Sequence, residues 1–170
     1  MDAIEAILSR RSIRKYTDAP VDDQTVQTLL ECAMAGPTAR NQQSWRFVVV
    51  RDAGQREKLS KASQWAGMIA DAPLAIVVCG DESAERNPGA YWVQDSTAAL
   101  ENILTAVNAL GLGAVWVGVH PWEDRIAVVR ETLDLPEHIH PLGTIAVGHP
   151  AEGKPPANRF DAEKVHFERW

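Results

Sequence analysis

Residues 74–79 read LAIVVC, a short apolar run that follows Pro73 and is rich in β-branched side chains. A continuous apolar run of this length is typical of a strand that is buried on both faces of a sheet. Residues 45–51 (WRFVVVR), 114–119 and 144–147 have the same character, so the sequence predicts four strands. We therefore expect one sheet with helices packed on each of its faces.

Segments before and between these strands have the apolar spacing of helices. Asp2 is suited to cap a first short helix that ends near Arg10, and a second helix is expected to begin at Asp22 or Asp23. The Gly-Pro pair at 36–37 is a typical stop for that second helix. The alternation of helices and strands along the chain favours a doubly wound sheet. Three further helices are expected at 55–63, 91–110 and 123–133.

The length of the chain, 170 residues, suits one domain that buries about 70% of its unfolded surface. We expect this domain to span 1–150, because the composition changes in 151–170. That last segment contains glycine, two prolines and many charged residues, and it ends in VHFERW. It is too polar to form a core of its own, so we expect an extended arm that lies on another surface.

Composition and charge argue against several classes of protein. An apolar content of 45%, a charged content of 24% and a mean hydropathy of −0.21 are typical of a globular protein. The longest apolar stretch, 109–119, is shorter than the ~20 residues of a membrane-spanning helix, and the first residues lack the order of a secretory signal. The net charge of −6 disfavours a general nucleic-acid surface. We expect a cytoplasmic protein with no membrane or nucleic-acid partner.

The cysteines and histidines form no recognisable metal motif. Cys32 and Cys79 lack a CxxC spacing, so we interpret them as packing thiols. His138 and His140 could lie on one face of a strand, but no third ligand has a recognised spacing. No GxSxG, Walker A or HExxH motif occurs either. The sequence therefore gives no positive sign of a metal site, acyl transfer or P-loop phosphoryl transfer.

A basic segment follows the first expected helix. If the chain is extended there, Arg10, Ser12 and Arg14 point to one side, and Arg11 and Lys15 add positive charge. Guanidinium groups and a hydroxyl are suited to binding phosphate. The segment predicts an anion cradle, and a solvated charged face is the alternative.

A loop rich in side-chain amides lies between the second expected helix and the first strand. Residues 37–45 read PTARNQQSW and include Asn41, Gln42 and Gln43. Amides carry donors and acceptors together, which match the edge of a purine or flavin ring. The loop is a candidate ligand-binding loop, and a merely polar loop is the alternative.

Residues 111–118, GLGAVWVG, match a dinucleotide-binding fingerprint only in part. GxGxxG requires glycine at the position where Trp116 stands, so this fingerprint fails. Gly118 would let a flat ligand approach the backbone. The alternative is a helix end followed by a buried strand.

Four of these motifs occur together and in one order along the chain. They are RRSIRKY (10–16), GPTARNQQSW (36–45), GLGAVWVGVHP (111–121) and VGHPAEGKPPANRF (147–160). In them, essentially the whole chain resembles the nitroreductase family of flavoproteins. The resemblance implies an α+β fold with a central mixed sheet of four to five strands and helices on both faces. It also implies a homodimer in which the C-terminal arm is exchanged between the subunits.

The resemblance further implies a redox function. The cofactor would be FMN, the electron donor NADH or NADPH, and the small-molecule acceptor a nitroaromatic or quinone, reduced by ping-pong hydride transfer. No catalytic side chain is expected, because the flavin carries the chemistry in such a protein. The alternatives are a flavin-binding or redox-sensing module without robust turnover, reductive dehalogenation and flavin destruction.

The resemblance also assigns cofactor-binding residues position by position. Arg10, Arg11 and Arg159 match phosphate contacts, Ser12 matches a position near the ribityl chain, and Arg14 matches a basic position near the pyrimidine. The loop that the partner subunit packs on the flavin corresponds to Pro37, Thr38, Ala39, Asn41 and Gln43. The backbone that approaches the ring corresponds to Trp116, Val117 and Gly118.

Two parts of the family pattern are less well matched. Ala157 stands where many relatives have a second basic residue, which leaves Lys154 as the neighbouring candidate. Gly148 matches a position beside the phosphate group. Within 62–72 no residue is assigned to the ring, so Gln64 and Asp71 stay without a role.

Overall fold

Two long strands form the centre of the sheet in the computed structural model, which describes residues 1–170. They are β2 (Leu74–Asp81) and β4 (Ile139–Gly148), with β1 (Trp45–Val50) and β3 (Gly113–Gly118) outside them in the order β1-β2-β4-β3. Every residue of β2 is buried. The prediction of strands covered on both faces is therefore confirmed for the centre of the sheet.

The four strands pair antiparallel throughout. The expected doubly wound sheet is therefore wrong, and the expected mixed character is limited to one isolated parallel bridge, between Ser12 and Ala114. β2 and β3 do run in the same direction, and α5 (Trp92–Ala109) connects them. However, β4 comes last along the chain and inserts between them, which the order of elements in the sequence does not reveal.

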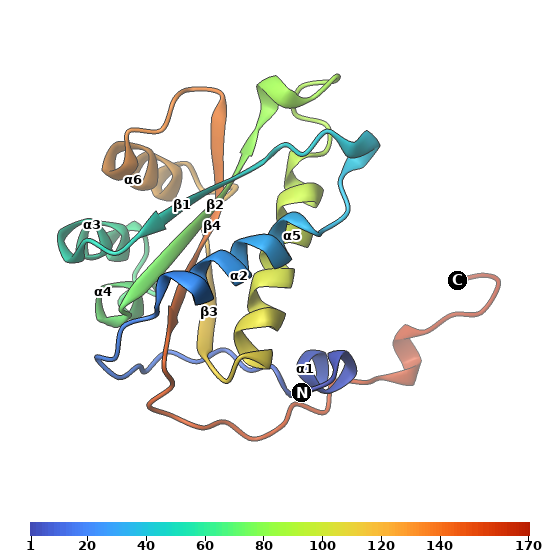
Figure 1. Cartoon of the computed structure of the whole chain (residues 1–170). Helices are drawn as coiled ribbons and strands as arrows, with labels where there is room; N and C mark the ends of the chain where they lie inside the picture. The colour runs from blue at the N-terminus through green and yellow to red at the C-terminus, as the bar shows by residue number, and fades with distance from the viewer.

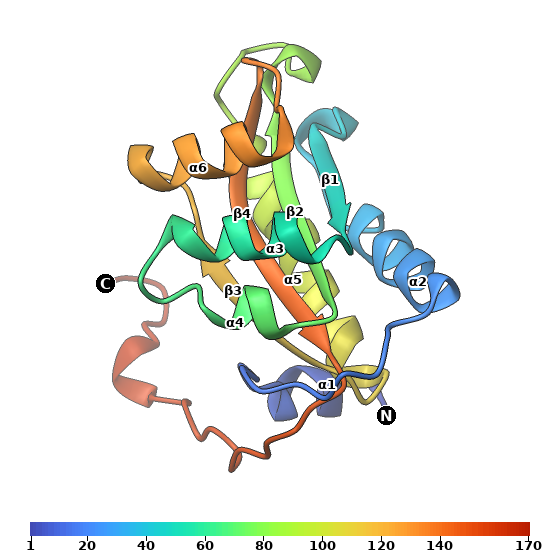
Figure 2. The ribbon, with the colours of Figure 1, turned by 90° about the vertical axis from the view of Figure 1, so that its left-hand side faces the viewer.

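Helices cover both faces of the sheet, as expected (Figures 1 and 2). Alternate residues of β2 point to the two faces, so Ile76 packs in the cluster that contains Leu100, whereas Val77 packs in the cluster that contains Leu59. None of the helices combines the length and the apolar character needed to cross a membrane. One face carries α2 (Asp23–Met34) and α5, with α1 (Ala3–Ser9) packed against α5, and the other face carries α3 (Ala53–Leu59), α4 (Met68–Asp71) and α6 (Glu123–Leu133).

The helix starts follow from local capping. The Asp2 carboxylate accepts a hydrogen bond from the Glu5 N–H at 2.9 Å, and the Asp22 carboxylate accepts one from the Thr25 N–H at 2.8 Å. Two elements differ from the expectation. β4 begins at Ile139 rather than at 144, because Pro141 lies at a register shift of its pairing with β2 and hides the strand pattern. The single-turn helix α4 is too short to show a helical period.

Both cysteines are free, in keeping with packing thiols. Cys79 is fully buried in β2, and burial raises the pKa of its thiol to about 12. Cys32 is half-buried in α2.

The two edges of the sheet differ. The Ile13 N–H donates to the Ala114 carbonyl at 2.9 Å, so the segment after α1 covers the outer edge of β3. β1 has no neighbour on its outer side. The segment 151–170 contains a single 3-10 turn, Ala162–Lys164, and no strand, and it runs away from the body of the chain (Figure 1). One sheet edge and one arm are thus left unpaired in the single chain.

Candidate functional site

Three arginines line one small pocket between α1 and the beginning of the C-terminal arm. Arg10, Arg11 and Arg159 border this pocket of about 210 Å³ together with Ile7 and Leu8. The Nε atom of Arg11 is buried and has no hydrogen-bond partner, whereas the Nε atom of Arg10 lies 3.3 Å from a carboxylate oxygen of Glu101. A buried guanidinium nitrogen without a partner is costly, and an anion would satisfy it. We call this the basic pocket.

Ser12 and Arg14 do not join Arg10 in that pocket, although the sequence placed all three on one side. Ser12 is half-buried, and its carbonyl accepts a hydrogen bond from Lys154 Nζ at 2.5 Å. Arg14 lines a second, larger pocket. The backbone N–H of Arg14 also donates to Glu152 at 2.6 Å, and this hydrogen bond lowers the pKa of the Glu152 carboxyl. These contacts tie the beginning of the arm to the segment after α1.

The second pocket has a volume of about 690 Å³, within the range of small-molecule sites. Arg14 and the end of β3, with Trp116, Val117 and Gly118, form part of its wall. We call it the ring pocket, because an exposed strand end and aromatic side chains offer flat surfaces to a planar ligand. Its other lining residues include Gln64, Trp65, Met68 and Arg125.

The sequence assigned none of these last four residues. Gln64, Trp65 and Met68 come from 62–72, where no motif was recognised, and Arg125 lies in the first turn of α6. The 71% exposure of Trp65 follows from its place on a short turn before α4. A tryptophan that follows Ser63 and Gln64 outside any apolar period was the one available signal.

Gly143 of β4 gives Trp116 its place in the wall of the ring pocket. A Cβ atom at Gly143 would lie 2.2 Å from Trp116 Nε1 and 3.1 Å from the Val117 carbonyl oxygen. The indole therefore crosses the neighbouring strand where only glycine leaves room.

The Gly143→Ala variant should lower Tm by roughly 2–10 °C, because overpacking in a well-packed region costs about 1–3 kcal/mol. The indole of Trp116 should also turn out of the pocket wall, which increases the quenching of tryptophan fluorescence by acrylamide. Gly118→Ala is the matched control, since nothing lies within 4 Å of its Cβ position. Equal Tm values for the two variants would contradict the close approach.

The amide-rich loop lies near the opposite end of α5 from the basic pocket. The Ala39 N–H donates to the buried Asp95 carboxylate at 3.0 Å, and the Gln43 N–H donates to Thr38 Oγ1 at 3.2 Å. Asp95 is near the start of α5, whereas Asn108, near its end, donates to the Ala6 carbonyl of α1. Because an α-helix rises about 1.5 Å per residue, Asp95 and Asn108 lie roughly 20 Å apart along α5. Within one chain the loop therefore does not meet the basic pocket (Figure 1).

The loop has an unusual backbone. Arg40, Asn41 and Gln43 have φ values of 54°, 54° and 53°, in the left-handed region. The Gln43 side-chain amide donates to Asn41 Oδ1 at 3.1 Å, and Pro37 is exposed beside them. The loop thus presents its polar side chains outward, toward whatever packs against this end of the chain.

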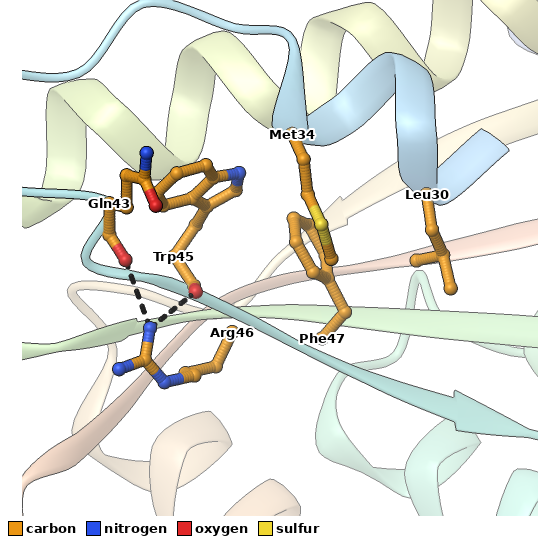
Figure 3. Close-up of a pocket in the computed structure, with 6 residues that line it drawn as sticks. All are labelled: Leu30, Met34, Gln43, Trp45, Arg46 and Phe47. Atoms are coloured by element: carbon orange, nitrogen blue, oxygen red, sulfur yellow. Dashed lines mark hydrogen bonds between the residues drawn. The ribbon is translucent and has the colours of Figure 1, made fainter. Parts of the chain in front are cut away.

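Gln43 lines a third pocket, of about 520 Å³, between α2 and the free edge of β1 (Figure 3). Arg46 borders it and donates to the carbonyls of Gln43 and Trp45, each at 2.9 Å. The indole N–H of Trp45 is buried without a hydrogen-bond partner. We call this the edge pocket. Its apolar lining residues are Leu30, Met34, Trp45 and Phe47.

Gly148 borders none of these three pockets. It is buried, and a Cβ atom there would lie 2.7 Å from Pro73 and 3.0 Å from Tyr16. Close packing explains this glycine without a ligand.

Comparison with known proteins identifies the family. Residues 7–67 and 64–149 match the model of the nitroreductase family. The chain is 45% identical to a protein of Methanothermobacter thermautotrophicus that is provisionally named an NADH dehydrogenase/NAD(P)H nitroreductase. The match covers 100% of this chain and 88% of that protein. The chain belongs to the nitroreductase family.

Solved structures agree in fold. A protein of Parabacteroides distasonis with the same provisional name has a TM-score of 0.94 at 39% identity, over 99% of this chain and 98% of that one. A protein of Desulfovibrio desulfuricans, provisionally identified as a nitroreductase and solved in complex with FMN, has a TM-score of 0.87 at 34% identity. The latter match covers 100% of this chain and 98% of the other.

Proposed function

We propose that this protein is a homodimeric, FMN-dependent NAD(P)H oxidoreductase that reduces nitroaromatic or quinone-type acceptors. The observation that carries the proposal is the unpartnered, buried Nε of Arg11 in a pocket with two further arginines. An anion bound there would satisfy this nitrogen, and the phosphate of FMN supplies one. The larger ring pocket accommodates a planar group of the size of a flavin ring.

Each part of the chain has a definite task in this proposal. Arg10, Arg11 and Arg159 hold the phosphate, and the end of β3 supports the ring. Arg14 stabilises negative charge near the pyrimidine side, where a preorganised cation is most effective in a site with little water. FMN, when bound, supplies hydride transfer between NAD(P)H and the acceptor. Two electrons and one proton leave NAD(P)H in this reaction, and solvent provides the second proton of the reduced acceptor.

The dimer explains why the amide-rich loop lies far from the basic pocket of its own chain. In a symmetric pair, this loop of one subunit covers the ring pocket of the other, which brings Pro37, Thr38, Ala39, Asn41 and Gln43 to the cofactor. The first helix supports such an assembly, because Ile4, Ile7 and Leu8 are 66%, 57% and 69% exposed. An exposed apolar helix face of this kind is typical of a surface that a partner covers.

The absorbance spectrum of the purified protein tests the proposal. We expect bound FMN, bleaching of its absorbance by NADH or NADPH under anaerobic conditions, and return of the colour on addition of menadione. A protein that binds FMN but is not reoxidised by menadione or a nitrofuran would be a binding or sensing module. A protein without affinity for FMN would refute the proposal entirely.

Steady-state kinetics give a second expected result. Because one ring pocket serves the donor and then the acceptor, double-reciprocal plots at several fixed acceptor concentrations should be parallel, as in substituted-enzyme kinetics. Product inhibition by NAD(P)⁺ is the companion measurement, and it should be competitive against the acceptor. Intersecting lines would demand that both substrates bind at once.

A further inference from the structure

The ring pocket is positively charged although the protein is acidic. Two of its lining residues, Arg14 and Arg125, are cations, and none of its lining residues is acidic. The net charge of the whole chain is −6. Positive charge concentrated in a concave site of an acidic protein favours an anionic ligand.

Arg125 carries much of this charge in a fixed position. Its Nη1 donates to the Gly118 carbonyl at 2.9 Å, and its guanidinium lies 5.4 Å from the centre of the Trp122 ring. No carboxylate forms an ion pair with it. The half-buried guanidinium is therefore oriented by neutral groups, and its charge is not compensated.

The stability of α6 does not account for a cation at this position. Arg125 lies in the first turn of α6, where the helix dipole favours acidic side chains such as Glu123 and Asp124. A positive charge there is slightly unfavourable for the helix. Its position is better explained by what enters the ring pocket beside Gly118.

The pocket also offers flat apolar surfaces. The side chains of Trp65 and Trp116 line it and are 71% and 38% exposed. Indoles exposed in a concave site gain free energy when a planar group covers them. The ring pocket therefore combines aromatic surfaces with one uncompensated guanidinium.

We propose that the ring pocket selects flat acceptors that carry a carboxylate or sulfonate, and that Arg125 is the residue that selects them. This inference rests on the proposed function, in which Arg14 already serves the cofactor and Arg125 is left for the acceptor. Arg125 pairs with the anionic substituent while the aromatic part of the acceptor lies in the part of the ring pocket that the flavin ring leaves open, beside Trp65. It acts on binding and selection only, and the hydride transfer is the one already described.

The test compares 4-nitrobenzoate with 4-nitrobenzamide, which have nearly the same shape and differ in charge. Flavin-loaded enzyme is reduced by light under anaerobic conditions with EDTA as the electron donor and is then mixed with each acceptor, so that NAD(P)H binding does not enter the measured rate. In the wild-type protein the rate constant should be higher for the carboxylate. In Arg125→Gln the ratio of the two rate constants should fall about tenfold, the value of one charge-assisted hydrogen bond at a partly exposed site. The intrinsic reactivity of the two acceptors cancels when wild type and variant are compared.

Two controls keep the inference falsifiable. Arg86→Gln removes an exposed arginine that lines none of the pockets described above and should leave the ratio unchanged. Arg125→Lys keeps the positive charge and should retain part of the preference for the carboxylate. It serves as the test variant if Arg125→Gln does not bind FMN. An equal loss of rate with both acceptors would show that Arg125 only supports Gly118, and the inference would be wrong. Absence of reoxidation by either acceptor in the wild-type protein would instead refute the proposed function.

Discussion

The Arg11→Ala variant should bind FMN roughly 10- to 100-fold more weakly than the wild-type protein and should bind riboflavin almost equally well. Charge-assisted hydrogen bonds contribute about 1.5–3 kcal/mol each, and the buried Nε of Arg11 has no partner other than the proposed phosphate. Riboflavin lacks the phosphate, so it does not report on that contact. Apoprotein is titrated with each flavin, and the quenching of flavin fluorescence reports the binding. The two titrations give the dissociation constants for FMN and for riboflavin.

Two comparisons give this result its meaning. Arg10→Ala should have a smaller effect, because Glu101 already balances part of the charge of Arg10. Arg86→Ala is the matched control for loss of one positive charge from the surface. Equal losses of FMN and riboflavin affinity in Arg11→Ala would assign Arg11 a role in folding or ring binding instead.

Removal of residues 161–170 should weaken the dimer at least about 100-fold and lower the FMN content per chain. Val165, Phe167 and Trp170 are 45%, 84% and 100% exposed in the single chain. Complete burial of such a side chain is worth about 1.5–3 kcal/mol, and a symmetric dimer buries each of them twice. We propose that the arm pairs with the free edge of the partner's β1 and that its aromatic residues enter the edge pocket. The unpartnered indole N–H of Trp45 would then gain an acceptor from the arm.

Light scattering across a dilution series, with flavin absorbance per protein, measures both effects. Phe167→Ala combined with Trp170→Ala keeps the length of the arm and should reproduce most of the loss. Glu163→Ala combined with Lys164→Ala changes exposed polar residues of the same arm and should not. A truncated protein that stays a fully flavin-loaded dimer would show that the arm has no part in assembly.

Local physical chemistry explains which parts of the fold the sequence could predict. The cap at Asp2, the start of α2 at Asp22 or Asp23, the stop at Gly36 and the apolar run of β2 are all determined within a few residues, and the sequence predicts each of them. The insertion of β4 between β2 and β3 depends on contacts between distant residues. No local pattern encodes this insertion, so the antiparallel sheet was not predicted.

The same reasoning applies to the candidate site. The family motifs mark the two arginines after α1 and Arg159, and these three residues line one pocket. Their role toward a phosphate stays a prediction. Trp65 and Arg125 were missed, since they come from a turn and a helix start whose sequences show no motif. Only the packing of α4 and α6 against the same face of the sheet places them beside β3.

The separation of the basic pocket and the amide-rich loop along α5 has a genetic consequence. If each complete site takes its basic pocket from one chain and its loop from the other, two defective chains can restore each other. In a mixed dimer, a chain with Arg11→Ala donates an intact loop to a partner whose loop is altered but whose basic pocket is intact. One of the two sites then contains only wild-type halves, while the other carries both defects. A mixed dimer would thus hold about half of the normal flavin content, and random pairing of equal amounts of the two chains would give about a quarter, from chains that are each deficient alone.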